Sequence, residues 1–462
     1  MSSPGREASF SGGQLRCCSP TLKRAVLVAV AAFVTVVLLT FLFWPIPTET
    51  DQNEVEYGQR WLSQVEQAKP EVLDLDSIQE EIRTSIEQLL ESYPRDPQSL
   101  HLAGIVYAEL KQTVMAERMF LASLVIEPNE IQVRHDLAEL FLMSGRDKEA
   151  LDVLERGREH GETQFAFVCL LAEAQSRLGL IPEAVTTLQA ALEKFPTAAK
   201  LWRILGELQL QQSNYALAES SLRKSIELDS QNEPAHFALC QTLALQKKTQ
   251  EATVARRRLD ELSTQNRATQ TSFEQVHQQT FRRFACSTFR SIAILHQTHR
   301  ELEKAKRAFH RAIQVDPTDL KTWSQMANYY RKLGDYENAA EVSRKIVLLQ
   351  PDELSHYSNL ASLCMEAGNA PFAEATLQTA ANRNVGGGLS HLLLARFLML
   401  RNKATGAVQP ARRAVELLET VDSYLVLIAA LDAVGKKDLA DAMRTQARKT
   451  APNDSRLKGN QK

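Results

Sequence analysis

Two sets of side chains that could do chemistry recur at intervals of 34 residues. Carboxylates lie at Glu139, Glu173 and Glu207, and zinc-type ligands lie at His101, His135 and Cys169. Paired carboxylates can act as general acid and base, and a zinc ion needs its ligands about 2.0–2.3 Å from one centre. If each interval of 34 residues forms one structural unit, side chains on successive units would lie too far apart for either chemistry. We therefore expect no catalytic residue, no metal site and no cofactor.

The composition also argues against several functional classes. Among 462 residues the net charge is -2, with 44% hydrophobic and 24% charged residues, so the basic footprint of a nucleic-acid-binding protein is missing. The sequence contains no GxxxxGK[ST], HExxH, GxSxG or GxGxxG motif. Its six cysteines form no CxxC pair and are expected to be isolated thiols. We therefore expect neither an enzyme nor a small-molecule substrate.

An apolar stretch near the N-terminus predicts a membrane anchor. Residues 25–44 contain no charge, and twenty helical residues at about 1.5 Å each cross a hydrocarbon core of about 30 Å. Lysine and arginine precede the stretch and acids follow it, so residues 1–24 are expected in the cytoplasm and the rest across the membrane, periplasmic in a bacterium. A cleaved signal peptide is the competing interpretation. The long apolar run without an A-x-A site favours a retained anchor.

The rest of the chain repeats a pattern of apolar and small residues. From residue 97 the pattern comprises Leu100, Ala103, Gly104, Tyr107, Ala116, Phe120, Ser123 and Pro128, and the same offsets recur from residues 286 and 320. Spacings of three and four place these residues on one stripe of a helix. Each unit therefore predicts two amphipathic helices joined by a turn, with small residues where the helices approach and a final proline that ends the second helix.

This pattern resembles the tetratricopeptide repeat, W-x2-L-G-x2-Y followed by A-x3-F and P. The resemblance implies an all-α fold, a right-handed α-α superhelix, preceded here by the single transmembrane helix. Units are expected near residues 97, 131, 165, 199 and 233, and again near 286, 320, 354, 388 and 421. The expected order is a tether with a capping helix or eroded repeat at 45–96, a first array at 97–264, an insert at 265–285, a second array at 286–454 and a tail at 455–462.

The insert is rich in glutamine and threonine and breaks the 34-residue period. A mobile linker and a long helix are both compatible with this composition. The spacing of Phe273, Val276, Phe281 and Phe284 favours a helix. In either case we expect the insert to bend or split the superhelix into two halves.

In the family that this pattern resembles, the first helix of each unit lines a concave groove that binds proteins or peptides. The candidate groove residues are His101, His135, Glu139, Glu173, Arg203, Glu207, Arg290, Asn328, Arg331, Asn359, Leu392 and Arg396. The three glutamates form either an acidic ladder for a basic partner or an ordinary solvated face. From residue 388 onward the inner face is apolar, and it suits either a partner helix or the chain's own C-terminal segment.

Asn328 and Asn359 resemble two positions of the clamp that holds the acidic tails of heat-shock chaperones in part of this family. The positions that should carry its cations are Ser324, Leu389 and Leu393, so the clamp is incomplete. The leading hypothesis is a membrane-anchored scaffold that binds other proteins. An accessory subunit of a membrane enzyme or transport complex is the alternative, and an enzyme is the weakest. The sequence does not indicate an oligomeric state.

Overall fold

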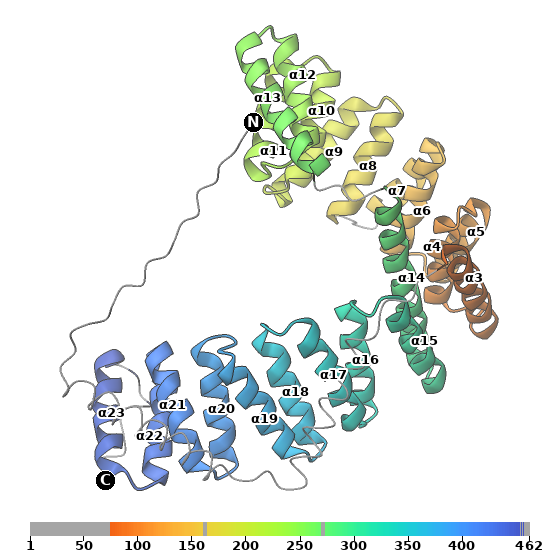
Figure 1. Cartoon of the computed structure of the whole chain (residues 1–462). Coiled ribbons are helices and arrows are strands. Elements are labelled where there is room, and N and C mark those ends of the chain that lie inside the picture. Colours follow the sequence, from red (N-terminus) through yellow and green to blue (C-terminus); the bar gives the residue numbers. More distant parts are fainter. Residues whose placement is uncertain (1–73, 160–163, 269–272, 453, 455, 457–462) are drawn as a thin grey trace, which may run out of the picture. The chain divides into compact units, whose positions relative to one another are not determined.

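The computed structural model describes residues 74–159, 164–268, 273–452, 454 and 456, and the elements in these ranges are α-helices (Figure 1). A single helix, α3 (Leu75–Ser92), precedes the first array, which consists of helix pairs. The pairs are α4 (Pro97–Glu109) with α5 (Thr113–Ile126), α6 (Ile131–Met143) with α7 (Asp147–Glu159), α8 (Phe165–Arg177) with α9 (Ile181–Lys194), α10 (Ala199–Gln211) with α11 (Tyr215–Leu228), and α12 (Glu233–Leu245) with α13 (Thr249–Ala268).

The second array has the same paired organisation. Its pairs are α14 (Phe273–Thr298) with α15 (Leu302–Val315), α16 (Leu320–Lys332) with α17 (Tyr336–Leu349), α18 (Leu354–Glu366) with α19 (Ala370–Asn382), α20 (Gly388–Leu400) with α21 (Ala404–Leu418), and α22 (Val421–Ala433) with α23 (Lys437–Thr450). In the described ranges no helix is both long enough and apolar enough to span a bilayer. The expected anchor at 25–44 and the segment before it lie outside these ranges.

The helix starts follow the 34-residue period. Apart from α14, the first helices of the pairs begin at residues 97, 131, 165, 199, 233, 320, 354, 388 and 421, which are the unit starts expected from the sequence. The turn inside each pair carries one residue in the left-handed conformation, at the fifteenth place of the unit. Glycine occupies that place in five units, as at Gly334, and an ordinary residue such as Lys247 occupies it in the others.

Close contact between the two helices of a pair depends on small residues. Gly104 on α4 faces the ring of Phe120 on α5, and a Cβ built on Gly104 would lie 2.4 Å from that ring. Phe120 is 1% exposed, and Ala116 beside it is fully buried. The glycine and alanine of the repeat pattern therefore provide the room that lets the large apolar side chain enter the core.

Both arrays meet at α3. Helix α14 packs against α3 and α4 as well as against its own partner α15, and Figure 1 shows it beside them. Phe281, Ala285 and Phe289 of α14 share one buried cluster with Ile82 and Ile86 of α3. The second array therefore resumes beside the start of the first array. The two arrays are joined through this apolar core, at the point in the chain where the sequence predicts a bend or split between two halves.

The insert at 265–285 is helical on both sides of residues 269–272, which lie outside the described residues. The long helix α14 includes residues 273–285, and it continues without interruption into the unit that begins at residue 286. From Phe281 onward its apolar side chains are buried or partly buried, whereas Val276 is 43% exposed. The later apolar residues of this helix therefore pack against α3 and α4.

Candidate functional site

Asp136 brings together histidines from two successive units. His101 Nε2 on α4 lies 2.7 Å from Asp136 Oδ2, and His135 Nδ1 on α6 lies 3.0 Å from Asp136 Oδ1. The side chains of His101, His135 and Asp136 are only 17–20% exposed. The two histidines, 34 residues apart in the chain, therefore contact the same carboxylate through its two different oxygens.

The same contacts determine the charges of this cluster. Burial raises the pKa of Asp136, but hydrogen bonds with His101 and His135 outweigh it and lower the pKa to about 2. The hydrogen bond to Asp136 raises the pKa of His135. Asp136 is therefore ionised at neutral pH and attracts positive charge between α4 and α6.

A cavity of about 510 Å³ opens on the inner side of α6, α8 and α10, and it contains the glutamate ladder. Glu173 accepts a hydrogen bond from Arg177 at 2.6 Å, and Glu207 accepts one from Arg203 at 2.6 Å. Two of the three ladder carboxylates are thus neutralised by arginines four residues away on the same helix. The first array presents mixed charges in this cavity, whereas the glutamates alone suggested an acidic face.

Two charged side chains in this cavity have no partner of their own. Glu139 on α6 and Lys200 on α10 make no hydrogen bond or ion pair with any residue that the structure describes. Their charges are opposite, and they lie on the first and last helices of the cavity. A bound segment could therefore pair with either of them without breaking an internal ion pair.

A second cavity, of about 350 Å³, lies between α16, α17 and α18. It is lined by Asn328, Arg331 and Asn359, and none of these side chains makes a hydrogen bond or ion pair among the described residues. The neighbouring unit offers no cation to this cavity, because Leu389 is half exposed and Leu393 packs against the core. The site therefore has two free amides and one free guanidinium.

Three other predicted groove residues have structural roles. The Arg290 guanidinium donates to the carboxylate of Asp319, and Arg396 Nη2 donates to Asp422 Oδ2 at 2.9 Å. Leu392 is 5% exposed and lies within the core. Helix α20 packs against both α21 and α22, so this buried side chain is not available to a partner.

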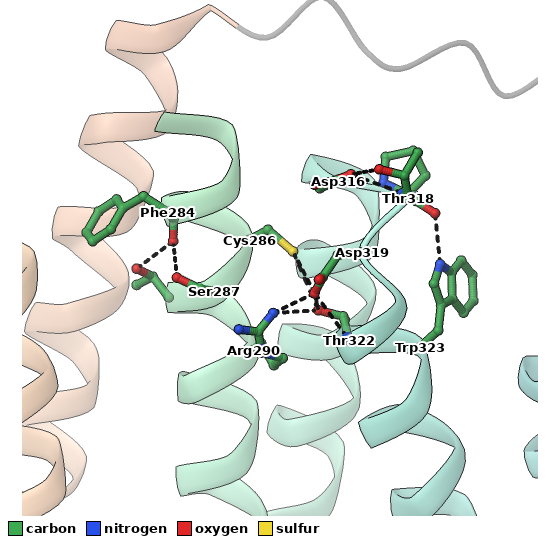
Figure 2. A network of polar contacts seen from close by, with 11 residues as sticks. Phe284, Cys286, Ser287, Arg290, Asp316, Thr318, Asp319, Thr322 and Trp323 are labelled. Atoms are coloured by element: carbon green, nitrogen blue, oxygen red, sulfur yellow. Dashed lines mark hydrogen bonds and ion pairs between the residues drawn. The ribbon is translucent and has the colours of Figure 1, made fainter. Parts of the chain in front are cut away.

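The Arg290 contact belongs to a polar network at the N-terminus of α16 (Figure 2). Asp319 caps the helix by accepting from the Thr322 backbone N–H at 3.0 Å, and Cys286 Sγ lies 3.6 Å from the same carboxylate. Burial raises the pKa of Cys286 to about 12, so the thiol stays protonated and unreactive. This network joins the first two units of the second array and stabilises them.

Family models match in both arrays. The matches are to tetratricopeptide repeats, over residues 169–233 in the first array and residues 320–353 in the second. The chain contains tetratricopeptide repeats. Their helix pairs and 34-residue period agree with the units described above, so the fold is an all-α repeat solenoid.

Similar proteins include a much longer chain and smaller solved structures. Superkiller protein 3 of Schizosaccharomyces pombe is 22% identical over 299 residues, which span 63% of this chain and 21% of that protein. The crystal structure of MamA has a TM-score of 0.34 at 16% identity and covers 36% of this chain and 96% of its own. YrrB, described as a TPR protein with an unusual peptide-binding site, has a TM-score of 0.34 at 15% identity over 38% of this chain and 91% of its own.

Proposed function

We propose that this protein is a membrane-tethered scaffold that binds extended protein segments along the inner helices of its repeats. The observation that carries the proposal is the cavity with Asn328, Asn359 and Arg331 side chains that have no internal partner. Polar side chains kept free in a concave surface are available for recognition, and solenoids use such surfaces for binding.

The chemistry of this cavity favours a peptide with an acidic side chain. An asparagine amide can donate to a backbone carbonyl and accept from a backbone N–H, so Asn328 and Asn359 suit an extended main chain. Arg331 offers the planar fork of donors that matches a carboxylate. With a single cation the cavity suits one acidic side chain better than a run of acids or a carboxylate tail.

The binding claim is tested by replacing the two amides. We expect Asn328→Ala and Asn359→Ala to lower the recovery of partners that co-purify with the full-length protein from solubilised membranes, with the melting temperature unchanged. Asn382→Ala is a matched control, because this asparagine on α19 is hydrogen bonded to Gln378 away from the cavity. Equal recovery from all three variants would refute binding at this cavity.

The membrane tether is supported by the apolar residues 25–44 and by the charges on either side of them. We propose that residues 1–24 are cytoplasmic and that the repeats lie on the opposite side. A C-terminal reporter that is active only in the cytoplasm should then give no signal. A strong signal would reverse the topology, and extraction of the full chain by carbonate alone would argue against a spanning anchor.

An accessory subunit of a membrane enzyme or transport complex is the alternative to a scaffold with many partners. Proximity labelling from the repeat arrays distinguishes the two. Many substoichiometric neighbours support the scaffold, and one stoichiometric companion supports the subunit.

A further inference from the structure

Three potential metal ligands lie together on one helix of the first array. His135, Asp136 and Glu139 on α6 each offer a ligand atom, and these atoms all lie within 4.8 Å of one another. His101 on α4 contacts the same carboxylate from the neighbouring unit, with its Nε2 2.7 Å from Asp136 Oδ2, whereas His135 Nδ1 lies 3.0 Å from the other oxygen. His101 is therefore placed to orient Asp136 rather than to share an ion with His135.

We propose that His135, Asp136 and Glu139 form a binding site for a divalent transition-metal ion, with Zn²⁺ as the best match and a water molecule as its fourth ligand. One imidazole nitrogen and two carboxylates suit zinc, which accepts nitrogen and oxygen ligands in a tetrahedral arrangement. With the imidazole neutral, the two carboxylates supply two negative charges to compensate the ion.

The observed distances are compatible with one ion. Ligands about 2.0–2.1 Å from a zinc ion lie about 3.3 Å from each other along the edges of the tetrahedron. His135 Nδ1 and Asp136 Oδ1 lie 3.0 Å apart, and the three ligand atoms lie within 4.8 Å of one another. Because all three side chains belong to α6, they can converge on an ion by rotation alone, without movement of α4 relative to α6.

The surroundings also suit a cation. Gln132 Nε2 donates to Asp136 Oδ1 at 2.9 Å, which is the kind of outer hydrogen bond that orients a ligand carboxylate. Glu139 is exposed to solvent, so an ion has a route into the cluster. Glu139 also has no hydrogen-bond or ion-pair partner among the described residues that an ion would need to displace. Lys200 faces the same cavity and is the nearby charge that opposes binding.

A bound ion would connect two successive units at the mouth of the groove. His101 lines a cavity shared by α4, α6 and α14, whereas His135 and Glu139 line the cavity between α6, α8 and α10. The ion would sit between these cavities and be linked to α4 through Asp136, which His101 contacts. Partner binding in the first array would then depend on the metal as well as on the side chains of the groove.

Calorimetric titration of the tag-free, chelator-treated full-length protein with zinc chloride tests the proposal. We expect one ion per chain at this site, and at least a tenfold loss of affinity in His135→Gln and in Glu139→Gln, since each changes a ligand. His101→Gln should weaken binding by a smaller factor, because it removes only a hydrogen bond to the ligand Asp136. His356→Gln, at a half-buried histidine on α18, is the matched control and should bind as the unchanged protein does.

Cobalt substitution distinguishes this site from the cysteines of the chain. Bound Co²⁺ should show the visible absorption of a tetrahedral nitrogen and oxygen site, without the intense near-ultraviolet band of a thiolate complex. Unchanged zinc affinity in His135→Gln and Glu139→Gln would overturn the proposal. So would an effect of these two variants equal to that of His356→Gln, or a thiolate spectrum that accounts for all bound cobalt.

Discussion

The guanidinium of Arg311 on α15 holds both carboxylate oxygens of Glu81 on α3, at 2.7 and 2.6 Å, although 230 residues separate the two in the chain. Helix α14 packs against both α3 and α15 at this junction between the arrays (Figure 1). A bidentate pair fixes orientation as well as distance. Arg311 and Glu81 therefore align the outer edge of a junction whose interior is apolar.

Arg311→Ala should weaken this junction by about 1–2 kcal/mol, because it removes a bidentate pair that is partly shielded from water. The expected result is a lower melting temperature and faster proteolysis between the arrays. Arg413→Ala, which removes an exposed pair within one helix, is the control and should have almost no effect. A charge exchange, Arg311→Glu with Glu81→Arg, should recover part of the loss if the pair itself is responsible.

Gly104→Ala should destabilise the first array by about 1–3 kcal/mol, because the added methyl group would overlap the ring of Phe120 in a filled core. Gly406→Ala on α21 is the opposite case. Its nearest neighbour would lie 3.8 Å away, so the gain in helix propensity should stabilise the second array by about 0.5–1 kcal/mol. Urea unfolding followed by circular dichroism measures both, and equal effects would show that packing at Gly104 is loose.

Lys247→Gly should stabilise the fold by up to about 1 kcal/mol, because the lysine backbone has a φ of 62° that costs an L-residue energy. Gly334 occupies the same place in another unit. Gly334→Ala should destabilise the fold by about 1 kcal/mol, although nothing lies within 4 Å of the added atom. Thermal melts of the two variants provide the comparison. A loss of stability in Lys247→Gly would mean that the lysine side chain contributes more than its backbone conformation costs.

Acid should weaken the junction through His296. Burial lowers the pKa of this histidine, whose Nδ1 lies 3.0 Å from Tyr93 Oη of the segment after α3. The unfolded chain therefore binds the proton more readily, so the stabilisation is complete above the unfolded pKa of about 6.5 and is lost as the pH falls below it. His296→Gln should show a smaller drop in melting temperature between about pH 7.5 and about pH 5.5 than the unchanged protein. An unaltered drop would place the pH sensitivity elsewhere.

The period of the repeats predicts much of the fold. Alanine at Ala116 and Ala305 and the residues around them locate each helix pair, because each unit must bury the same stripe against the same neighbours. The position of α14 could not be predicted in this way. Repeat order indicates that each unit stacks on the one before it, and nothing local in residues 273–298 reveals that their apolar face fits α3, which lies far away in the sequence.

The candidate site was only partly predictable. Glu173 and Glu207 could be assigned to a groove from their place in the unit, and the arginines four residues away give a sequence signal for the internal pairing that we did not use. The role of Asp136 has no such signal, since a carboxylate beside a histidine is common on a solvated helix. Only the geometry shows that it also reaches His101 in the preceding unit.

The junction at α3 determines the order in which parts of this protein can be buried during synthesis. The buried face of α3, with Ile82 and Ile86, leaves the ribosome long before the helix that covers it. The 230 residues between Glu81 and Arg311 take about 10–50 s to synthesise at roughly 5–20 residues per second. For most of that interval the growing first array carries an uncovered apolar end, which makes the nascent chain a client for chaperones until α14 arrives.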